Sequence, residues 1–189
     1  MSRGTAIAIA IAVLACGAPG GIATAATSRS AAGACANDGI VAMDDAARVQ
    51  AVEAVRCLIN LERANRGLRA LRASAPLQNA ATGHSADMVA SKFLSHTSAN
   101  GDSFRRRILR NGYVRRTRGW SVGETLTWGS GGFATPAQLV SALMQSPEHR
   151  RTILDRRFLD MGVGMVLGAP MDGMTVGRAA TVTVDFGHR

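Results

Sequence analysis

Aromatic residues and lysine are scarce in this sequence, and their scarcity argues against one class of partner. Only 4% of the residues are aromatic, and Lys92 is the only lysine. Proteins that bind single-stranded nucleic acid stack the bases on aromatic side chains, and the other common modules carry recognisable motifs that are missing here. Although the formal net charge is +9, we therefore expect no nucleic-acid partner.

Several motifs of catalytic and structural sites are also missing. The sequence has three cysteines but no C-x-x-C pair and no cluster of cysteine with histidine, so no zinc-finger-like structural site is expected. The H-E-x-x-H pair of zinc peptidases, the Walker phosphate loop and the glycine-rich dinucleotide loop are absent as well. No repeat of about 20–50 residues is visible, which argues against a solenoid or a propeller.

The first 25 residues have the pattern of a secretory signal peptide. Ser2-Arg3 precedes an uncharged run from Thr5 to Cys16, and Ala23-Thr24-Ala25 supplies a cleavage site of small residues. The run is too short to span a membrane stably. An alternative interpretation is a lipoprotein signal that ends before Cys16, which would then carry the lipid. Under either interpretation the protein leaves the cytoplasm.

Two cysteines, Cys35 and Cys57, remain after cleavage at Ala25. An even pair in an oxidising compartment predicts a disulfide, with two unpaired buried thiols as the alternative. The bridge would join a loose arm, residues 26–45, to the first helix of one domain that covers residues 46–189. A chain of 189 residues can bury a core that needs no metal for folding.

Arginine supplies nearly all of the positive charge, and about half of the arginines fall in three clusters. Removal of residues 1–25 takes only Arg3 from the +9 of the whole chain and leaves +8. Such a surface is attracted to anionic polymers, so we expect the protein to associate peripherally with the cell envelope. We also expect a monomer. The clusters are Arg105-Arg106-Arg107-Arg110, Arg115-Arg116-Arg118 and Arg150-Arg151-Arg156-Arg157.

Hydrophobic periodicity and capping residues predict several helices. Val52, Val55 and Ile59 share one face of a helix over 46–65, and Gly67 follows it where a left-handed cap belongs. Serine, threonine and proline mark the starts of other helices. These helices are expected from Ser74, over 103–110, from Thr135 and from Ser146.

Three apolar or alternating segments predict strands, at 120–128, 161–167 and 180–186. Helices come first in the chain, and a single helical block separates the first strand from the other two. This order does not produce a parallel sheet of alternating strands and helices. We therefore predict an α+β fold with a small antiparallel three-stranded sheet flanked by helices.

Three polar side chains at the borders of these elements are the candidates for a functional site. His96 lies in a turn-rich loop, Glu124 lies beside a glycine in a predicted strand, and His149 is the third residue of the helix that Ser146 caps and Pro147 begins. The unpaired N–H groups and positive dipole of that helix start favour a neutral imidazole. Two imidazoles and a carboxylate could bind Zn²⁺ or another divalent cation, or could move protons.

The remaining histidines and one serine motif have simpler interpretations. His84 falls on an apolar helix face, so we expect a hydrogen-bonded core histidine, and His188 is expected in a solvated tail. The run Gly119-Trp120-Ser121-Val122-Gly123 matches the G-x-S-x-G motif of serine hydrolases. That motif requires a helix after the serine, whereas a strand-like run follows here, so a chance match is the better interpretation.

Six short motifs occur along the chain in an order that resembles bacterial CAP domains. They are Leu58-Ile59-Asn60-Leu61-Glu62-Arg63, Gly83-His84-Ser85-Ala86-Asp87-Met88, Ser95-His96-Thr97, Gly123-Glu124, Ser146-Pro147-Glu148-His149-Arg150 and Met161-Gly162-Val163-Gly164. The superfamily includes cysteine-rich secretory proteins, insect venom allergens and plant pathogenesis-related proteins. The resemblance covers Val55 to Gly187 and implies an α-β-α sandwich with a central cleft.

The family cleft typically carries two histidines and two acidic residues, sometimes with a divalent metal. On this resemblance His96 and His149 match the two histidines, and Glu124 matches the first glutamate. The remaining acidic position falls on Ser146, so the acidic pair is incomplete. A short arm with a cysteine before the first helix also resembles actinobacterial members, which supports a disulfide between the two remaining cysteines.

The resemblance implies a function in binding rather than in catalysis. Members of the superfamily are mostly discussed as binding modules, and hydrolysis would need a base and an activated water or nucleophile. We expect a secreted or envelope-associated binding protein for a lipid, an envelope glycan or a protein partner. The alternative is a metal-dependent hydrolase that uses His96, Glu124 and His149.

Overall fold

The computed structural model describes residues 35–114, 119–172 and 178–189. The predicted signal peptide, the alternative lipid-carrying Cys16 and the arginines at 115–118 lie outside these residues. Within the described ranges, no helix is both long enough and apolar enough to cross a membrane.

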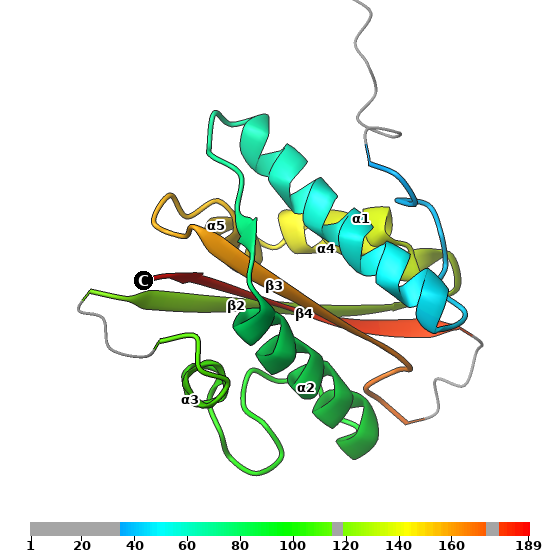
Figure 1. Cartoon of the computed structure of the whole chain (residues 1–189). Helices are drawn as coiled ribbons and strands as arrows, with labels where there is room; N and C mark the ends of the chain where they lie inside the picture. Colours follow the sequence, from blue (N-terminus) through cyan, green and yellow to red (C-terminus); the bar gives the residue numbers. More distant parts are fainter. Residues whose placement is uncertain (1–34, 115–118, 173–177) are drawn as a thin grey trace, which may run out of the picture. The chain divides into compact units, whose positions relative to one another are not determined.

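Three helices cover one face of a β-sheet. They are α1 (Asp45–Ala64), α4 (Pro136–Gln145) and α5 (Pro147–Ile153), which lie above the sheet in Figure 1. The first begins where the side chain of Asp44 accepts a hydrogen bond of 2.8 Å from the backbone N–H of Ala47, the usual way to satisfy a free N–H at a helix start. Apart from shifts of one or two residues, these helices are where the sequence predicts them.

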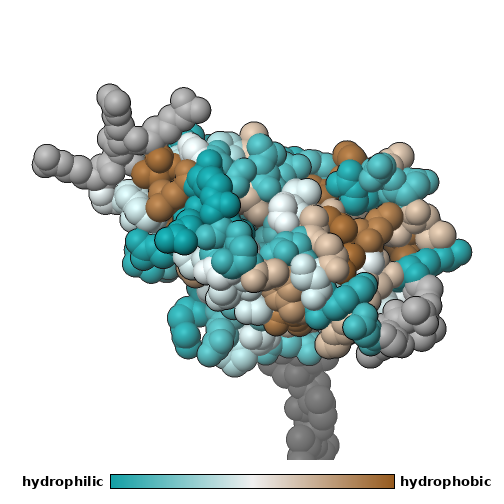
Figure 2. All heavy atoms as spheres, turned by 90° about the horizontal axis from the view of Figure 1, so that it is seen from below, coloured by the Kyte–Doolittle hydropathy of each residue, from teal (hydrophilic) through white to brown (hydrophobic). Residues whose placement is uncertain are grey.

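Two helices cover the opposite face, below the sheet in Figure 1. They are α2 (Ala75–Ser91) and α3 (Phe104–Arg110). The second ends before Gly112, whose φ of 79° is a conformation that favours glycine. Figure 2 views the molecule from this side and shows hydrophobic patches separated by hydrophilic side chains.

The sheet has one strand more than predicted. Three strands, β2 (Ser121–Ser130), β3 (Asp160–Leu167) and β4 (Ala179–His188), are antiparallel as expected. The fourth, β1 (Arg72–Ala73), pairs in parallel with β3, and the order is β1-β3-β4-β2. Two residues are too few to show strand periodicity, which is why the prediction of a three-stranded sheet missed it. A 3-10 helix, η1 (Gly131–Ala134), joins β2 to α4.

The C-terminal histidine corrects a second prediction. His188 is the last residue of β4 and pairs with Ser121 at the start of β2. Its Nδ1 atom is buried and has no hydrogen-bond partner in the described part of the chain. The side chain therefore belongs to the sheet and not to a solvated tail.

The two faces of the sheet are packed in different ways. Large apolar side chains fill the space between the sheet and α1, α4 and α5. On the other face α2 lies directly on β3, because a Cβ atom added to Gly164 would be 2.1 Å from the backbone nitrogen of Thr82. The buried side chains of the first face include Val55, Ile59, Leu139, Leu143, Ile153, Val182, Val184 and Phe186.

A disulfide fastens the N-terminal arm to α1. The bridge joins Cys35 to Cys57, as predicted, with Cα atoms 5.8 Å apart. After it, the carbonyl of Asp38 accepts a hydrogen bond of 2.9 Å from the backbone N–H of Ala137 in α4. Residues 35–44 thus pack against the core and connect two helices of the same face.

The close packing of α2 on β3 leads to a stability prediction. Gly164→Ala should lower the free energy of unfolding by about 1–3 kcal/mol, because the new methyl group meets backbone atoms that cannot move aside. Gly83→Ala is the matched control, since nothing lies within 4 Å of a Cβ atom there. It should raise the free energy of unfolding by up to about 1 kcal/mol, because alanine favours a helix. Urea unfolding measures both, and equal effects would contradict the direct packing.

Candidate functional site

His96 and Glu124 meet at β2, an edge strand of the sheet. His96 lies in the loop between α2 and α3, and its Nδ1 donates a hydrogen bond of 2.8 Å to Oε1 of Glu124. The Glu124 side chain is fully buried, whereas 48% of the His96 side chain is exposed. A buried carboxylate therefore fixes the orientation of an accessible imidazole and leaves its Nε2 as the outward-facing nitrogen.

Arg107 of α3 holds the other oxygen of Glu124. Its guanidinium donates to Oε2 of that carboxylate. It also donates to the carbonyls of His96 and Asp102 and to the hydroxyl of Ser98, at 3.0–3.1 Å. One buried cation therefore binds the helix, the histidine loop and the edge strand together. In the sequence this residue is one of four clustered arginines, and nothing distinguishes it from the three that surround it.

Asp185 is a second carboxyl group in this cluster, which sequence analysis did not identify. It lies directly opposite Glu124 in the pairing of β2 with β4, and its side chain is completely buried. Neither of its carboxyl oxygens has a hydrogen-bond partner within the described residues. Burial raises the pKa of Asp185 well above its usual range, the charge of Glu124 raises it further, and Arg107 lowers it. The surroundings of Asp185 therefore favour its protonated form.

His84 lies behind the same cluster and is the core histidine that the sequence predicts. It is completely buried. Its Nε2 donates to the carbonyl of Ser95 at 2.8 Å, and the hydroxyl of Ser98 is 3.5 Å from its Nδ1. Burial lowers the pKa of His84, so the ring stays neutral.

His149 approaches His96 from the opposite face of the sheet. It is the third residue of α5, and the centroids of the two imidazole rings are 6.4 Å apart. Burial lowers the pKa of His149, the neighbouring His96 lowers it further, and Glu148 raises it. Ser146 is the cap residue of this helix, although its side chain makes no capping hydrogen bond. The structure thus brings both histidines and Glu124 to one place.

The donors in this cluster do not fit the predicted metal site. Glu124 is fully buried and uses one oxygen for His96 and the other for Arg107, so it can orient an imidazole but cannot itself reach a metal ion. The two imidazoles that remain are fewer than the three protein ligands of a catalytic zinc site. Across the described ranges, no group of three or more His, Cys, Asp or Glu side chains is arranged to hold a metal.

The serine of the G-x-S-x-G match is also misplaced for catalysis. Ser121 begins β2, and the chain continues as strand to Ser130 instead of turning into a helix. Its Oγ atom is buried and has no hydrogen-bond partner in the described structure. The nucleophile elbow of a serine hydrolase is therefore not formed, in agreement with the interpretation of a chance match.

A protein-family match covers most of the domain. Residues 57–179 match the model of the cysteine-rich secretory protein family, CAP. YkwD, an uncharacterized protein of Bacillus subtilis (strain 168), is 31% identical over 109 residues, which are 58% of this chain and 40% of that protein. The chain therefore spans about two fifths of the length of this curated relative.

Solved structures share the fold at low sequence identity. An extracellular protein containing an SCP domain from Bacillus anthracis has a TM-score of 0.60 and 20% identity, over 78% of this chain and 45% of that chain. An outer surface protein from Borrelia burgdorferi has a TM-score of 0.57 and 18% identity, over 71% and 90%. A cysteine-rich secretory protein from Staphylococcus aureus has a TM-score of 0.53 and 16% identity, over 75% and 39%. These likenesses confirm the predicted α+β sandwich.

The buried position of Arg107 leads to a second stability prediction. Arg107→Leu should lower the free energy of unfolding by about 3–5 kcal/mol, because Glu124 would remain buried without its cationic partner. Arg105→Leu is the matched control on the same helix, since Arg105 is exposed and only stacks over the ring of Trp120. Its loss should cost less than about 1 kcal/mol. Similar costs for the two variants in urea unfolding would rule out this role for Arg107.

The closeness of the two site histidines leads to a titration prediction. Replacing His96 by alanine should raise the pKa of His149, because both the neighbouring charge and part of the burial are removed. Glu148→Gln should lower the same pKa, because it removes the group that favours the charged ring. NMR titration of the imidazole signals measures both changes. An unchanged His149 pKa in His96→Ala would mean that the rings are not neighbours.

Proposed function

The chain belongs to the cysteine-rich secretory protein family, and from this premise we propose that it is a non-catalytic lipid-binding protein of the extracellular space or the cell envelope. The observation that carries the proposal is an apolar groove between α1 and α4. The location is supported by the descriptions of two proteins of similar fold, one extracellular and one an outer surface protein.

The groove has a size suited to a small hydrophobic ligand. Its volume is about 670 Å³, within the usual range for ligand pockets. The N-terminal arm closes one side, held there by the disulfide and by the hydrogen bond to α4. The lining residues are Asp38, Gly39, Leu58, Leu61, Glu62, Thr135, Ala137, Gln138, Val140, Ser141, Met144 and Gln145.

The chemistry of the lining favours an alkyl chain. The large apolar residues that line the groove are Leu58 and Leu61 of α1 and Val140 and Met144 of α4. Although the chain has a net charge of +9, the groove is lined by no arginine or lysine. Each buried methylene contributes about 0.8 kcal/mol to binding. A chain of eight or more carbons would therefore bind without help from a charged contact.

The histidine cluster supports the non-catalytic part of the proposal. Both oxygens of Glu124 are engaged, Asp185 is buried, and Ser146 stands where the family has an acid. The imidazole of His96 is exposed and that of His149 is partly buried, and within the described ranges no group of three or more His, Cys, Asp or Glu side chains is arranged to hold a metal. This arrangement favours a role in holding the loop and the edge strand over the hydrolase alternative.

Binding of alkanols of increasing length tests the proposal. In isothermal titration calorimetry, affinity should rise about fourfold for each added methylene from 1-octanol to 1-dodecanol, the equivalent of about 0.8 kcal/mol. Ser141→Trp should lower the affinity at least about tenfold, because Ser141 is exposed and lines the groove, so that a bulky ring fills it without disturbing the core.

Ala142→Trp is the matched control for this experiment. Ala142 is the next residue of α4, equally exposed, but it does not line the groove. The affinity for alkanols should stay unchanged in this variant. The proposal fails if affinity is independent of chain length, or if the two tryptophan variants behave alike.

A further inference from the structure

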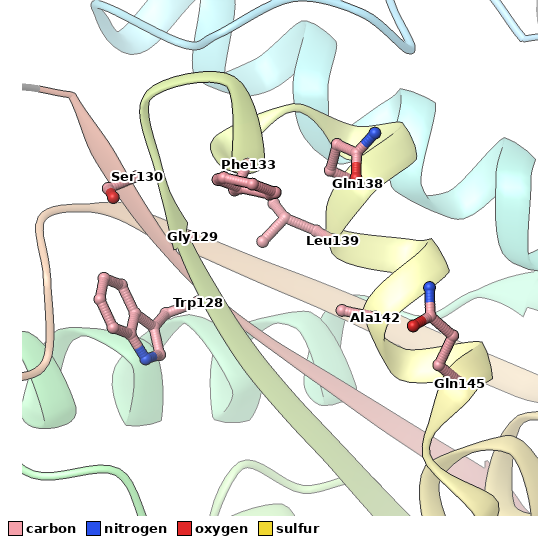
Figure 3. A pocket seen from close by; sticks show the side chains of 8 residues that line it. All are labelled: Trp128, Gly129, Ser130, Phe133, Gln138, Leu139, Ala142 and Gln145. Carbon is pink, nitrogen blue, oxygen red and sulfur yellow. The ribbon is translucent and has the colours of Figure 1, made fainter.

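A second cavity lies on the other side of α4, where β2 ends and η1 begins (Figure 3). Its volume is about 390 Å³. It shares two residues, Gln138 and Gln145, with the larger groove, so one ligand could reach both. The lining residues are Trp128, Gly129, Ser130, Phe133, Gln138, Leu139, Ala142 and Gln145.

The position of Phe133 is fixed by the backbone, although its ring is exposed. Gly129 of β2 lies so close to η1 that an added Cβ atom would be 2.1 Å from the carbonyl oxygen of Phe133. The ring itself is 73% exposed. Figure 3 shows it between β2 and α4, together with Leu139. An aromatic ring on a fixed backbone that remains open to solvent is suited to stack against a flat ligand.

The polar groups of this cavity are amides and a hydroxyl, without a charge. The side-chain amide of Gln138 has no hydrogen-bond partner among the residues that the structure describes. Gln145 donates only to the hydroxyl of Ser141, at 3.0 Å, which leaves its carbonyl oxygen available. Neither cavity is lined by arginine or lysine, and Asp38 and Glu62 border the larger one. This charge pattern disfavours a phosphate or a sulfate group.

We propose that the ligand is a neutral glycolipid, whose alkyl chain occupies the α1–α4 groove and whose sugar ring stacks on Phe133 in the second cavity. The alkyl part of this inference rests on the proposed function. A pyranose ring has apolar C–H faces that can lie against an aromatic ring, and its hydroxyl groups can pair with the amides of Gln138 and Gln145. The sugar-binding part also depends on Phe133, which does not line the alkyl groove.

Octyl β-glucoside, below its micelle concentration, is the probe that tests the sugar site. It should bind about three- to tenfold more tightly than 1-octanol, the gain expected from one aromatic stacking contact. Phe133→Ala and Ala142→Trp should remove this gain and leave the affinity for 1-octanol unchanged. In Trp120→Phe, Trp128 is the only tryptophan left, and its fluorescence should respond to octyl glucoside but not to 1-octanol.

The outcomes separate this inference from the proposed function. Loss of 1-octanol binding in Ser141→Trp, with a glucoside gain that depends on Phe133, supports both. Equal affinities for octyl glucoside and 1-octanol overturn the sugar site alone, as does tighter binding of octyl phosphate than of octyl glucoside. If 1-octanol does not bind the wild-type protein at all, the alkyl groove is wrong, and with it the glycolipid.

Discussion

The buried guanidinium of Arg107 is the interaction on which the histidine cluster depends. A charge taken out of water must be paired and hydrogen-bonded to be tolerated. Arg107 satisfies this requirement with the carboxylate of Glu124 and with three acceptors from the loop that carries His96. The position of the loop therefore follows from the needs of one cation. Glu124 in turn accepts a hydrogen bond from the ring of His96. Arg107 of α3 therefore orients the accessible imidazole indirectly, through Glu124.

The same arrangement leaves Glu124 without a free carboxylate oxygen for a metal ion or a substrate. Glu124 is neutralised by Arg107 on one oxygen and oriented toward His96 on the other. Asp185 lies opposite it on β4, and its burial favours the protonated form. Glu124 and Asp185 are therefore used inside the protein, and the groups nearer the surface are the two imidazoles and Glu148 beside His149.

Much of the fold could be predicted from the sequence, because long elements leave clear periodic signals. The helices, the three long strands and the disulfide are where the sequence indicates. The two-residue β1 carries no such signal. Asn60 and Arg63 lie outside the apolar face that the sequence shows for α1, yet both bond to backbone groups of other segments, Asn60 with Leu71 and Arg63 with the carbonyl of Ile153.

The site was predictable only in part. His96, Glu124 and His149 were identified, because histidines are few and the family motifs mark them. Arg107 and Asp185 were not, because their importance comes from burial and strand register, which the sequence does not display. The two cavities beside α4 have no motif either. Their walls come from α1, the arm, β2 and η1, and only the packed structure brings these together.

The proposed lipid binding is centred on α4 and not on the histidines, and native mass spectrometry tests this proposal most directly. The full chain would be incubated with a lipid extract of the cell envelope and then freed of unbound lipid. We predict one neutral lipid per chain, retained in His149→Ala and lost in Ser141→Trp. A chain without bound lipid, or a lipid lost in His149→Ala but retained in Ser141→Trp, would contradict the account.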